Sequence, residues 1–151
     1  MAKFIWHVSL NTGIDVIDEQ HRRIMLHIND LHQAVETADQ SAIGNVLDEL
    51  VDYTLSHFAF EEGLMAQANY PMLEPHKQVH QQFINKVENF KLRFLQGEDV
   101  SQELLTMLHR WLINHIQNED ADYVKSVNDN IVQQGQGLAA KNTSWLKRLF
   151  A

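Results

Sequence analysis

Cysteine is absent from the 151-residue sequence, which excludes disulfides, thiolate zinc sites and cysteine-ligated iron–sulfur clusters. Any metal that the chain binds must therefore be held by nitrogen and oxygen atoms. Basic residues are also scarce, because 12 Lys and Arg stand against 20 Asp and Glu and leave a formal net charge of −8. This balance argues against nucleic acid as a partner.

Long apolar runs are missing as well. No segment approaches the length of a membrane span, and the N-terminus lacks the apolar stretch of a signal peptide, so we expect a cytoplasmic protein. With 44% hydrophobic residues, the chain can bury one good core. It divides into an N-terminal arm (1–14), a helical bundle (15–133) and a short C-terminal amphipathic tail (134–151). We expect Ile5 and Trp6 of the arm to pack against an end of the bundle.

Four stretches of the sequence carry apolar residues at every third or fourth position, which is the period of an amphipathic helix. Turn-forming residues separate these stretches at 39–41, 68–71 and 97–99. Because the connections are short, neighbouring helices run antiparallel. The sequence thus predicts an all-α fold, an up-down-up-down antiparallel four-helix bundle.

Ionisable residues interrupt all four apolar stripes. His21 precedes the first turn by about 19 residues, and His57 with Glu61 follows it by about as many, so the rise of the helices places them at one level. The other interruptions lie at matching distances from their turns. A buried polar group without a partner costs about 2–7 kcal/mol, so this cluster predicts a site for two metal ions. The predicted ligands are His21, His57, Glu61, His76, His80, His115 and a carboxylate at position 119 or 120.

These residues, in this order, resemble the hemerythrin family, and specifically its single-domain bacterial members. The resemblance covers most of the chain. A lone pair of histidines four residues apart decides little, but the motifs together are specific. They are Trp6, Asp18–His21 (DEQH), Tyr53–Glu62 (YTLSHFAFEE), His76-x-x-x-His80, Trp111–Ile116 (WLINHI), Asp120 and Tyr123.

The resemblance implies a non-haem di-iron centre. Three histidines would hold one iron: His76, His80 and His115. Two would hold the other, His21 and His57, and both irons would be bridged by an oxo or hydroxo group and by Glu61 and Asp120. The iron with two histidines keeps an open position, at which members of the family bind O2 reversibly.

Position 120 is selected by the resemblance alone. Glu119 lies four residues after His115 and would share its helical face, whereas Asp120 lies about 140° around an ideal helix. Choosing Asp120 therefore requires a local widening of the helix, such as a π-bulge. Glu62 is rotated by about 100° from Glu61, and we expect it to meet solvent.

We expect apolar residues close to His57 and His115 along their helices to form a wall that shields the open position from water. We expect this wall to be formed by Phe58, Trp111, Leu112 and Ile116. In the family, the residue that matches Leu112 borders bound O2.

Two functions are compatible with such a centre. The first is reversible O2 binding for storage, delivery or sensing, by a protein that is not an enzyme. The alternative is a di-iron redox enzyme acting on O2, peroxide or nitric oxide. Oxygen-activating bundles use mostly glutamate ligands, whereas five of the seven ligands here are neutral imidazoles, which favours binding. A structural zinc or nickel site is a third interpretation, but two bridging carboxylates and an open position are wasteful there.

The tail has a charge pattern of its own. Its only charged residues are Lys141, Lys147 and Arg148, while residues 1–134 carry a charge of −11. Its apolar residues recur at helical spacing: Trp145, Leu146, Leu149 and Phe150. Residues 141–151 are therefore expected to follow one of two courses. In the first, they fold back onto the bundle or contact another copy of the chain. In the second, they contact a protein partner or a membrane surface weakly, and the membrane contact would place the protein at the inner membrane.

Overall fold

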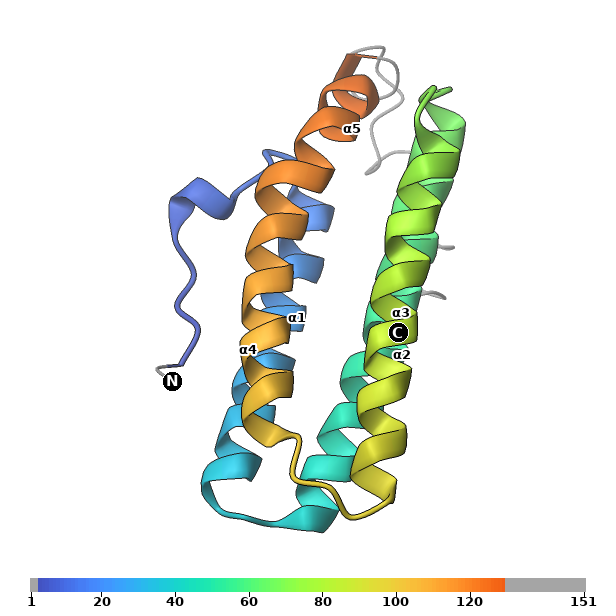
Figure 1. Ribbon diagram of the computed structural model, residues 1–151. Coiled ribbons are helices and arrows are strands. Elements are labelled where there is room, and N and C mark those ends of the chain that lie inside the picture. The colour runs from blue at the N-terminus through green and yellow to red at the C-terminus, as the bar shows by residue number, and fades with distance from the viewer. Residues whose placement is uncertain (1–2, 130–151) are drawn as a thin grey trace.

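The computed structural model describes residues 3–129, with the backbone alone for 119–121 (Figure 1). After the short 3₁₀ helix η1 (Val8–Leu10), the helices are α1 (Asp15–Glu36), α2 (Gln40–Gln67), α3 (Leu73–Leu95) and α4 (Ser101–Asn114). The rod that starts with α4 continues through a π-helical turn, η2 (His115–Glu119), into α5 (Asp120–Val127). No strand occurs among the described residues. The predicted all-α, up-down-up-down antiparallel four-helix bundle is confirmed.

The turns between the helices fall close to their predicted positions. The first lies slightly earlier than predicted, because α2 already begins at Gln40. Asp39 caps α2, since its side chain accepts a hydrogen bond of 3.1 Å from the Ala42 N–H. Ala38 in this turn and Asn69 in the next adopt positive φ angles of 53° and 55°. Asparagine tolerates this left-handed conformation, whereas alanine is strained by it.

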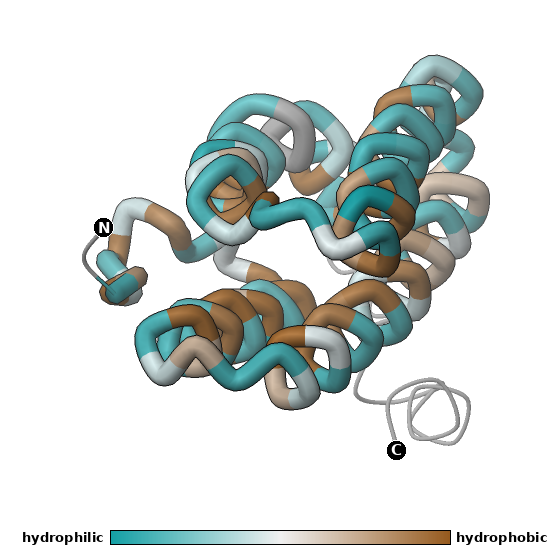
Figure 2. The backbone as a smooth tube through the Cα atoms, turned by 60° about the horizontal axis from the view of Figure 1, so that its bottom comes forward, coloured by the Kyte–Doolittle hydropathy of each residue, from teal (hydrophilic) through white to brown (hydrophobic). Residues whose placement is uncertain are grey.

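Apolar side chains fill the bundle in two clusters with a polar layer between them. On α1, Ile24 belongs to one cluster and Ile17 to the other, and His21 lies between them in sequence and is fully buried. Leu50 and Leu64 of α2 belong to the same two clusters. Hydrophobic residues recur along one side of each helix (Figure 2). Since each fully buried aliphatic side chain contributes about 1.5–3 kcal/mol, the helices are held together on both sides of the polar layer.

The N-terminal arm packs differently from the prediction. Ile5 is 82% exposed, so its expected packing against the bundle is wrong. Its neighbour Phe4 is buried instead, and the Phe4 backbone exchanges two hydrogen bonds with the Asn29 side chain at 2.7 and 2.9 Å. Its ring meets the edge of His109 at 4.5 Å, while Trp6 is half-buried against the core. The arm therefore lies along the side of α1 and α4 (Figure 1), and not at an end of the bundle.

The described helices run from Asp15 to Val127. The predicted end of the bundle at 133 and the whole tail, 134–151, lie outside the described residues. Among residues 3–129, no helix combines the length and the apolar character needed to cross a bilayer.

Candidate metal centre

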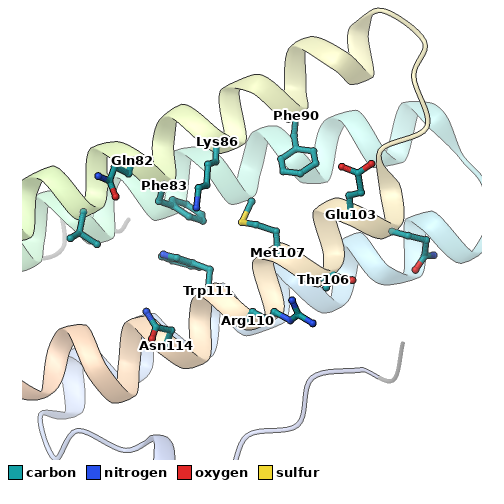
Figure 3. A pocket seen from close by; sticks show the side chains of 12 residues that line it. Gln82, Phe83, Lys86, Phe90, Glu103, Thr106, Met107, Arg110, Trp111 and Asn114 are labelled. Carbon is teal, nitrogen blue, oxygen red and sulfur yellow. The ribbon is translucent and has the colours of Figure 1, made fainter.

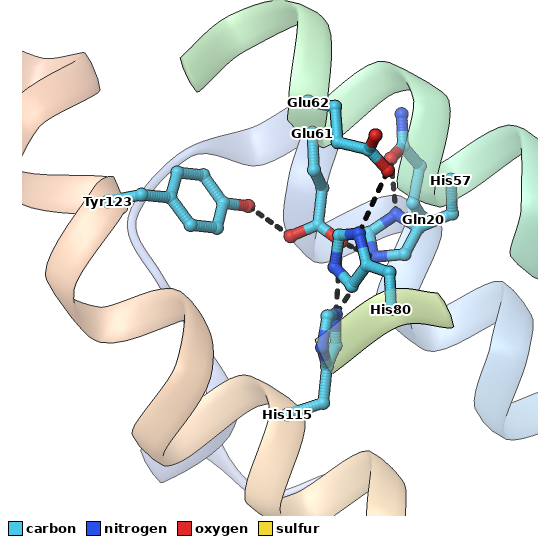
Figure 4. A network of polar contacts seen from close by, with 7 residues as sticks. All are labelled: Gln20, His57, Glu61, Glu62, His80, His115 and Tyr123. Carbon is cyan, nitrogen blue, oxygen red and sulfur yellow. Dashed lines mark hydrogen bonds and ion pairs between the residues drawn. The ribbon is translucent and has the colours of Figure 1, made fainter. Parts of the chain in front are cut away.

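The polar layer brings six of the predicted ligands together from every rod of the bundle. All six side chains are buried, and Figure 4 shows several of them converging. They are His21 on α1, His57 and Glu61 on α2, His76 and His80 on α3, and His115 at the start of η2. Their ligand atoms form two groups, and within each group they lie within 4.8 Å of one another. Glu61 belongs to both groups, as a bridging ligand requires.

The carboxylate of Glu61 occupies the middle of the layer. Its Oε1 lies 2.7 Å from His57 Nε2, 3.1 Å from His115 Nε2 and 3.7 Å from His80 Nε2. Its Oε2 accepts a hydrogen bond of 2.5 Å from the Tyr123 hydroxyl. One oxygen of Glu61 thus faces the histidines, while the other is held by Tyr123 from α5.

His115 stands between the two groups. The geometric grouping places it with His21 and His57, whereas the resemblance implies that it ligates the same iron as His76 and His80. Its ring centroid is 5.4 Å from that of His57 and 5.7 Å from that of His80. Because these distances are nearly equal, the assignment of His115 to one iron stays a prediction.

Burial controls the ionisation of the cluster. It lowers the pKa of His21 and His57, and that of His80 to about 3, because desolvation disfavours the charged imidazolium. Burial by itself raises the pKa of Glu61, but the neighbouring His57 and His115 hold it well below its usual value. The layer therefore offers neutral imidazoles and a carboxylate anion, which are the protonation states that bind metal ions.

Two further side chains hold the ligands from outside, and the sequence did not reveal either of them. Gln20 is buried beside His21 on α1, and its Oε1 lies 2.7 Å from His57 Nδ1. Glu62 Oε2 lies 3.0 Å from His80 Nδ1. Glu62 keeps partial contact with solvent, as expected, since its side chain is 27% exposed, but it also lies against His80 of α3, which was not foreseen. The helical period of α2 alone could not show this, since it does not say where α3 packs.

The widening predicted near His115 is present. Residues His115–Glu119 form a π-helical turn, in which hydrogen bonds connect residues five positions apart. Such a turn brings a residue at the fifth position toward the side of the first, where an α-helix would bring the fourth. The backbone therefore has the geometry that Asp120 would need as a ligand. Its side chain lies outside what the structure describes, and its bridging role stays a prediction.

Aromatic rings line the site on the side of α3 and α4. Phe58 stacks on the His80 imidazole at 3.8 Å, and Trp111 stacks on that of His115 at 5.0 Å. Leu112 and Ile116 are buried in the core of the bundle. All four predicted wall residues therefore lie in or against the core, and two of them touch ligand imidazoles. Whether they border an open metal position stays a prediction.

A groove of about 780 Å³ lies beyond this wall, between α3 and α4 (Figure 3). Its apolar lining includes Phe83 and Trp111, which stack on each other at 3.9 Å. Since Trp111 also contacts His115, the indole ring separates the metal layer from the groove.

The donor set fits a pair of metal ions. The Nε2 atom of His80 is buried, faces Glu61 and has no hydrogen-bond partner among the described residues. Leaving such an atom unsatisfied costs about 1–3 kcal/mol, which a metal ion between His80 and Glu61 would remove. Imidazole nitrogen and carboxylate oxygen are ligands for iron, zinc, copper or nickel. The fold and the site together define a four-helix bundle protein with a buried histidine and carboxylate metal centre.

Comparison with known proteins makes this class specific. A family model, the hemerythrin HHE cation binding domain, matches residues 12–127. A bacteriohemerythrin from Stenotrophomonas maltophilia is 53% identical over 133 residues, which cover 88% of this chain and 87% of that protein. One from Pseudomonas aeruginosa is 54% identical over 127 residues, or 84% of this chain and 83% of that protein.

A solved structure gives the same result. The crystal structure of wild-type hemerythrin superimposes with a TM-score of 0.78 at 31% identity, and the match covers 83% of this chain and 98% of that one. The chain belongs to the hemerythrin family.

Proposed function

We propose that the chain binds O2 reversibly at a non-haem di-iron centre and serves oxygen storage, delivery or sensing. The observation that supports this most directly is the pair of buried ligand groups that share Glu61. When two irons are bound there, they supply the electrons and the open coordination position that O2 binding needs. In this proposal an oxo or hydroxo group, Glu61 and Asp120 bridge the irons. The histidines divide as the resemblance implies: His76, His80 and His115 on one iron, His21 and His57 on the other.

The residues around the polar layer exclude water from it and hold the Glu61 carboxylate in one orientation. Phe58, Leu112 and Ile116 are at most 4% exposed, so water reaches the layer poorly from their side. Excluding water and protons from the layer favours the release of O2 unchanged. Proton donors close to the metals would instead promote irreversible oxidation of the site. Tyr123 fixes one oxygen of Glu61 and leaves the other facing the histidines.

The visible spectrum tests the proposal. Iron-loaded protein would be reduced without air, exposed to O2 and then degassed. A colour that appears with O2 and disappears on degassing is the expected result. The control is His57→Leu, which removes a ligand of the Glu61 layer and should abolish the colour. Irreversible consumption of O2 would instead identify a redox enzyme acting on O2, peroxide or nitric oxide, and the absence of any change would refute O2 chemistry altogether.

The location of the protein follows from a separate proposal on the tail, which rests on sequence alone. The protein is cytoplasmic, and residues 141–151 contact the inner-membrane surface weakly, with basic residues near anionic lipid contributing about 1 kcal/mol each. Full-length protein should co-sediment with anionic vesicles at low salt, while a chain ending at Gln134 should not. Neutral vesicles are the control. If both chains stay in the supernatant, packing of the tail against protein becomes the better account.

A further inference from the structure

The two ligand groups differ in the atom that accepts a hydrogen bond from a ligand histidine. His80 Nδ1 lies 3.0 Å from a carboxylate oxygen of Glu62, and His57 Nδ1 lies 2.7 Å from the amide oxygen of Gln20. Figure 4 shows both contacts, between Glu62 and His80 and between Gln20 and His57. The same arrangement thus occurs twice, once with a charged acceptor and once with a neutral one.

Both contacts place the imidazole hydrogen on Nδ1. An ionised carboxylate and an amide oxygen only accept hydrogen bonds, so in each pair Nδ1–H is the donor. The Nε2 atom then offers a lone pair to a metal ion when one is bound, and His57 Nε2 also lies within hydrogen-bond distance of His115 Nε2, at 3.2 Å. In both histidines it is Nε2 that faces Glu61, at 2.7 Å from His57 and 3.7 Å from His80. Glu62 and Gln20 therefore orient the two rings for binding through the same nitrogen.

The charge on the acceptor makes the two rings unequal donors. Hydrogen bonds to an ionised group are about twice as strong as those between neutral groups. A carboxylate behind a ligating histidine also raises the basicity of the ring and strengthens its bond to the metal. Glu62 is partly exposed, but its oxygen is in direct contact with His80, so no water separates the pair. His80 is the more electron-rich ligand, and His57 is the less electron-rich one.

We propose that Glu62 and Gln20 are positioning residues that make the two metals of the site unequal. Through His80, Glu62 strengthens the group that contains His76, so this half binds its metal first and releases it last. Through His57, Gln20 orients the other half without adding charge. The inference rests on the proposed function only in taking iron as the natural occupant.

Nuclear magnetic resonance of the metal-free protein tests the tautomers. Long-range ¹H–¹⁵N spectra should show His57 and His80 protonated on Nδ1. Glu62→Gln should keep this tautomer at His80, because the amide still accepts, whereas Glu62→Leu should lose it. Neither change should affect His57. Finding His80 protonated on Nε2 in the unmodified protein would overturn the proposal.

Stepwise metal binding tests the inequality. With Zn²⁺ added to the metal-free protein, the His80 signals should shift before those of His57. Isothermal titration should show Glu62→Gln weakening the tighter step by about ten-fold, the lower end of what loss of such a partner costs. Gln20→Glu should strengthen the weaker step. The double variant, which combines Glu62→Gln with Gln20→Glu, should reverse the order in which the two metal sites fill.

A matched control separates the hydrogen bond from simple charge. Glu74→Gln removes one negative charge from α3 near His76, but Glu74 is exposed, forms an ion pair with Lys77 and, through its charge, adds to the rise in the Glu62 pKa that burial causes. Because its removal leaves Glu62 no less ionised, it should weaken neither step. The proposal fails if Glu62→Gln behaves like Glu74→Gln, or if it weakens both steps equally. The two proposals can fail independently. Because the titration uses Zn²⁺, which does not bind O2, its result does not depend on whether the iron-loaded protein binds O2. Equal affinities of the two metal sites would likewise not contradict O2 binding.

Discussion

Acid should destabilise the metal-free protein well above the pH at which carboxylates titrate. Burial lowers the pKa of His21, His57 and His80, and the pKa of His80 falls to about 3. In the unfolded chain the same imidazoles titrate near about 6.5. Between these values the unfolded chain binds more protons than the folded one. The stability is therefore complete above about pH 6.5 and falls as the pH drops below it.

The expected loss is large. One pKa unit corresponds to about 1.4 kcal/mol, so at about pH 5.5 the His80 imidazole alone costs about 1.4 kcal/mol, and His21 and His57 add to the loss in the same direction. Domains of this kind are stable by only about 5–15 kcal/mol. Bound metal excludes protons from the same nitrogen atoms, so the loss should shift to lower pH in the metal-loaded protein.

Urea unfolding with a chelator present, followed by circular dichroism between about pH 8 and 5.5, measures this dependence. The range stays above the titration of ordinary carboxyl groups, at about pH 4.3. The slope of stability against pH counts the protons taken up on unfolding. His80→Leu should lower the slope by about one proton, whereas replacing the exposed His7 with Gln should retain the contribution of the buried cluster. A stability that stays constant or rises on acidification would refute the assignment of buried, neutral imidazoles.

Three further predictions, each made on substituted variants, have definite expected outcomes. Asp120→Ala should lose most of the bound iron while Glu119→Ala keeps it, and equal iron contents by elemental analysis would contradict the proposed bridge. Leu112→Ala should still bind O2 but oxidise faster to the diferric form, because the space left by a fully buried side chain admits water and protons; an unchanged decay of the O2-dependent colour at fixed pH would count against this role. Ala38→Gly should raise the free energy of unfolding by about 1 kcal/mol, since glycine is not strained at a φ of 53°; a urea melt that shows a loss would mean that the turn is relaxed.

The sequence predicted the bundle and the layer because both depend on regular repetition. His21 and His57 occupy positions of the helical period that only a buried side chain can take, and the distances to the turns set their level. The structure buries both fully. The arm has no such period. Within it, Phe4 is buried and Ile5 is exposed, although they are neighbours of similar hydrophobicity, and the contact with Asn29 of α1 distinguishes them.

Glu62 shows a second limit of the periodic argument. Its position on α2 is correctly placed about 100° from Glu61, yet that direction leads to His80 of α3 as well as to water. A helix in a bundle has two neighbours, so the flanks of its buried stripe are contact regions whose partners depend on the packing of other helices. Side chains that support a ligand from outside occupy these flanks, which is why Gln20 and Glu62 appear only once the helices are assembled.

The proposed ligand pair His115 and Asp120 requires a departure from regular α-helical geometry, and the π-helical turn is where that departure occurs. A spacing of five residues between His115 and Asp120 cannot place both on one face of an α-helix, and nothing in the composition of residues 115–119 favours a wider turn. The turn is retained where the helix passes the metal layer, with α-helix on both sides of it. If Asp120 bridges the metals, as we propose, the widened backbone is a requirement of the site. Deleting one residue from η2 should then restore a regular α-helix, shift α5 and Tyr123 out of register with Glu61, and abolish metal binding while helix content is retained. A deletion variant that still binds two metals would show that the widening serves some other purpose.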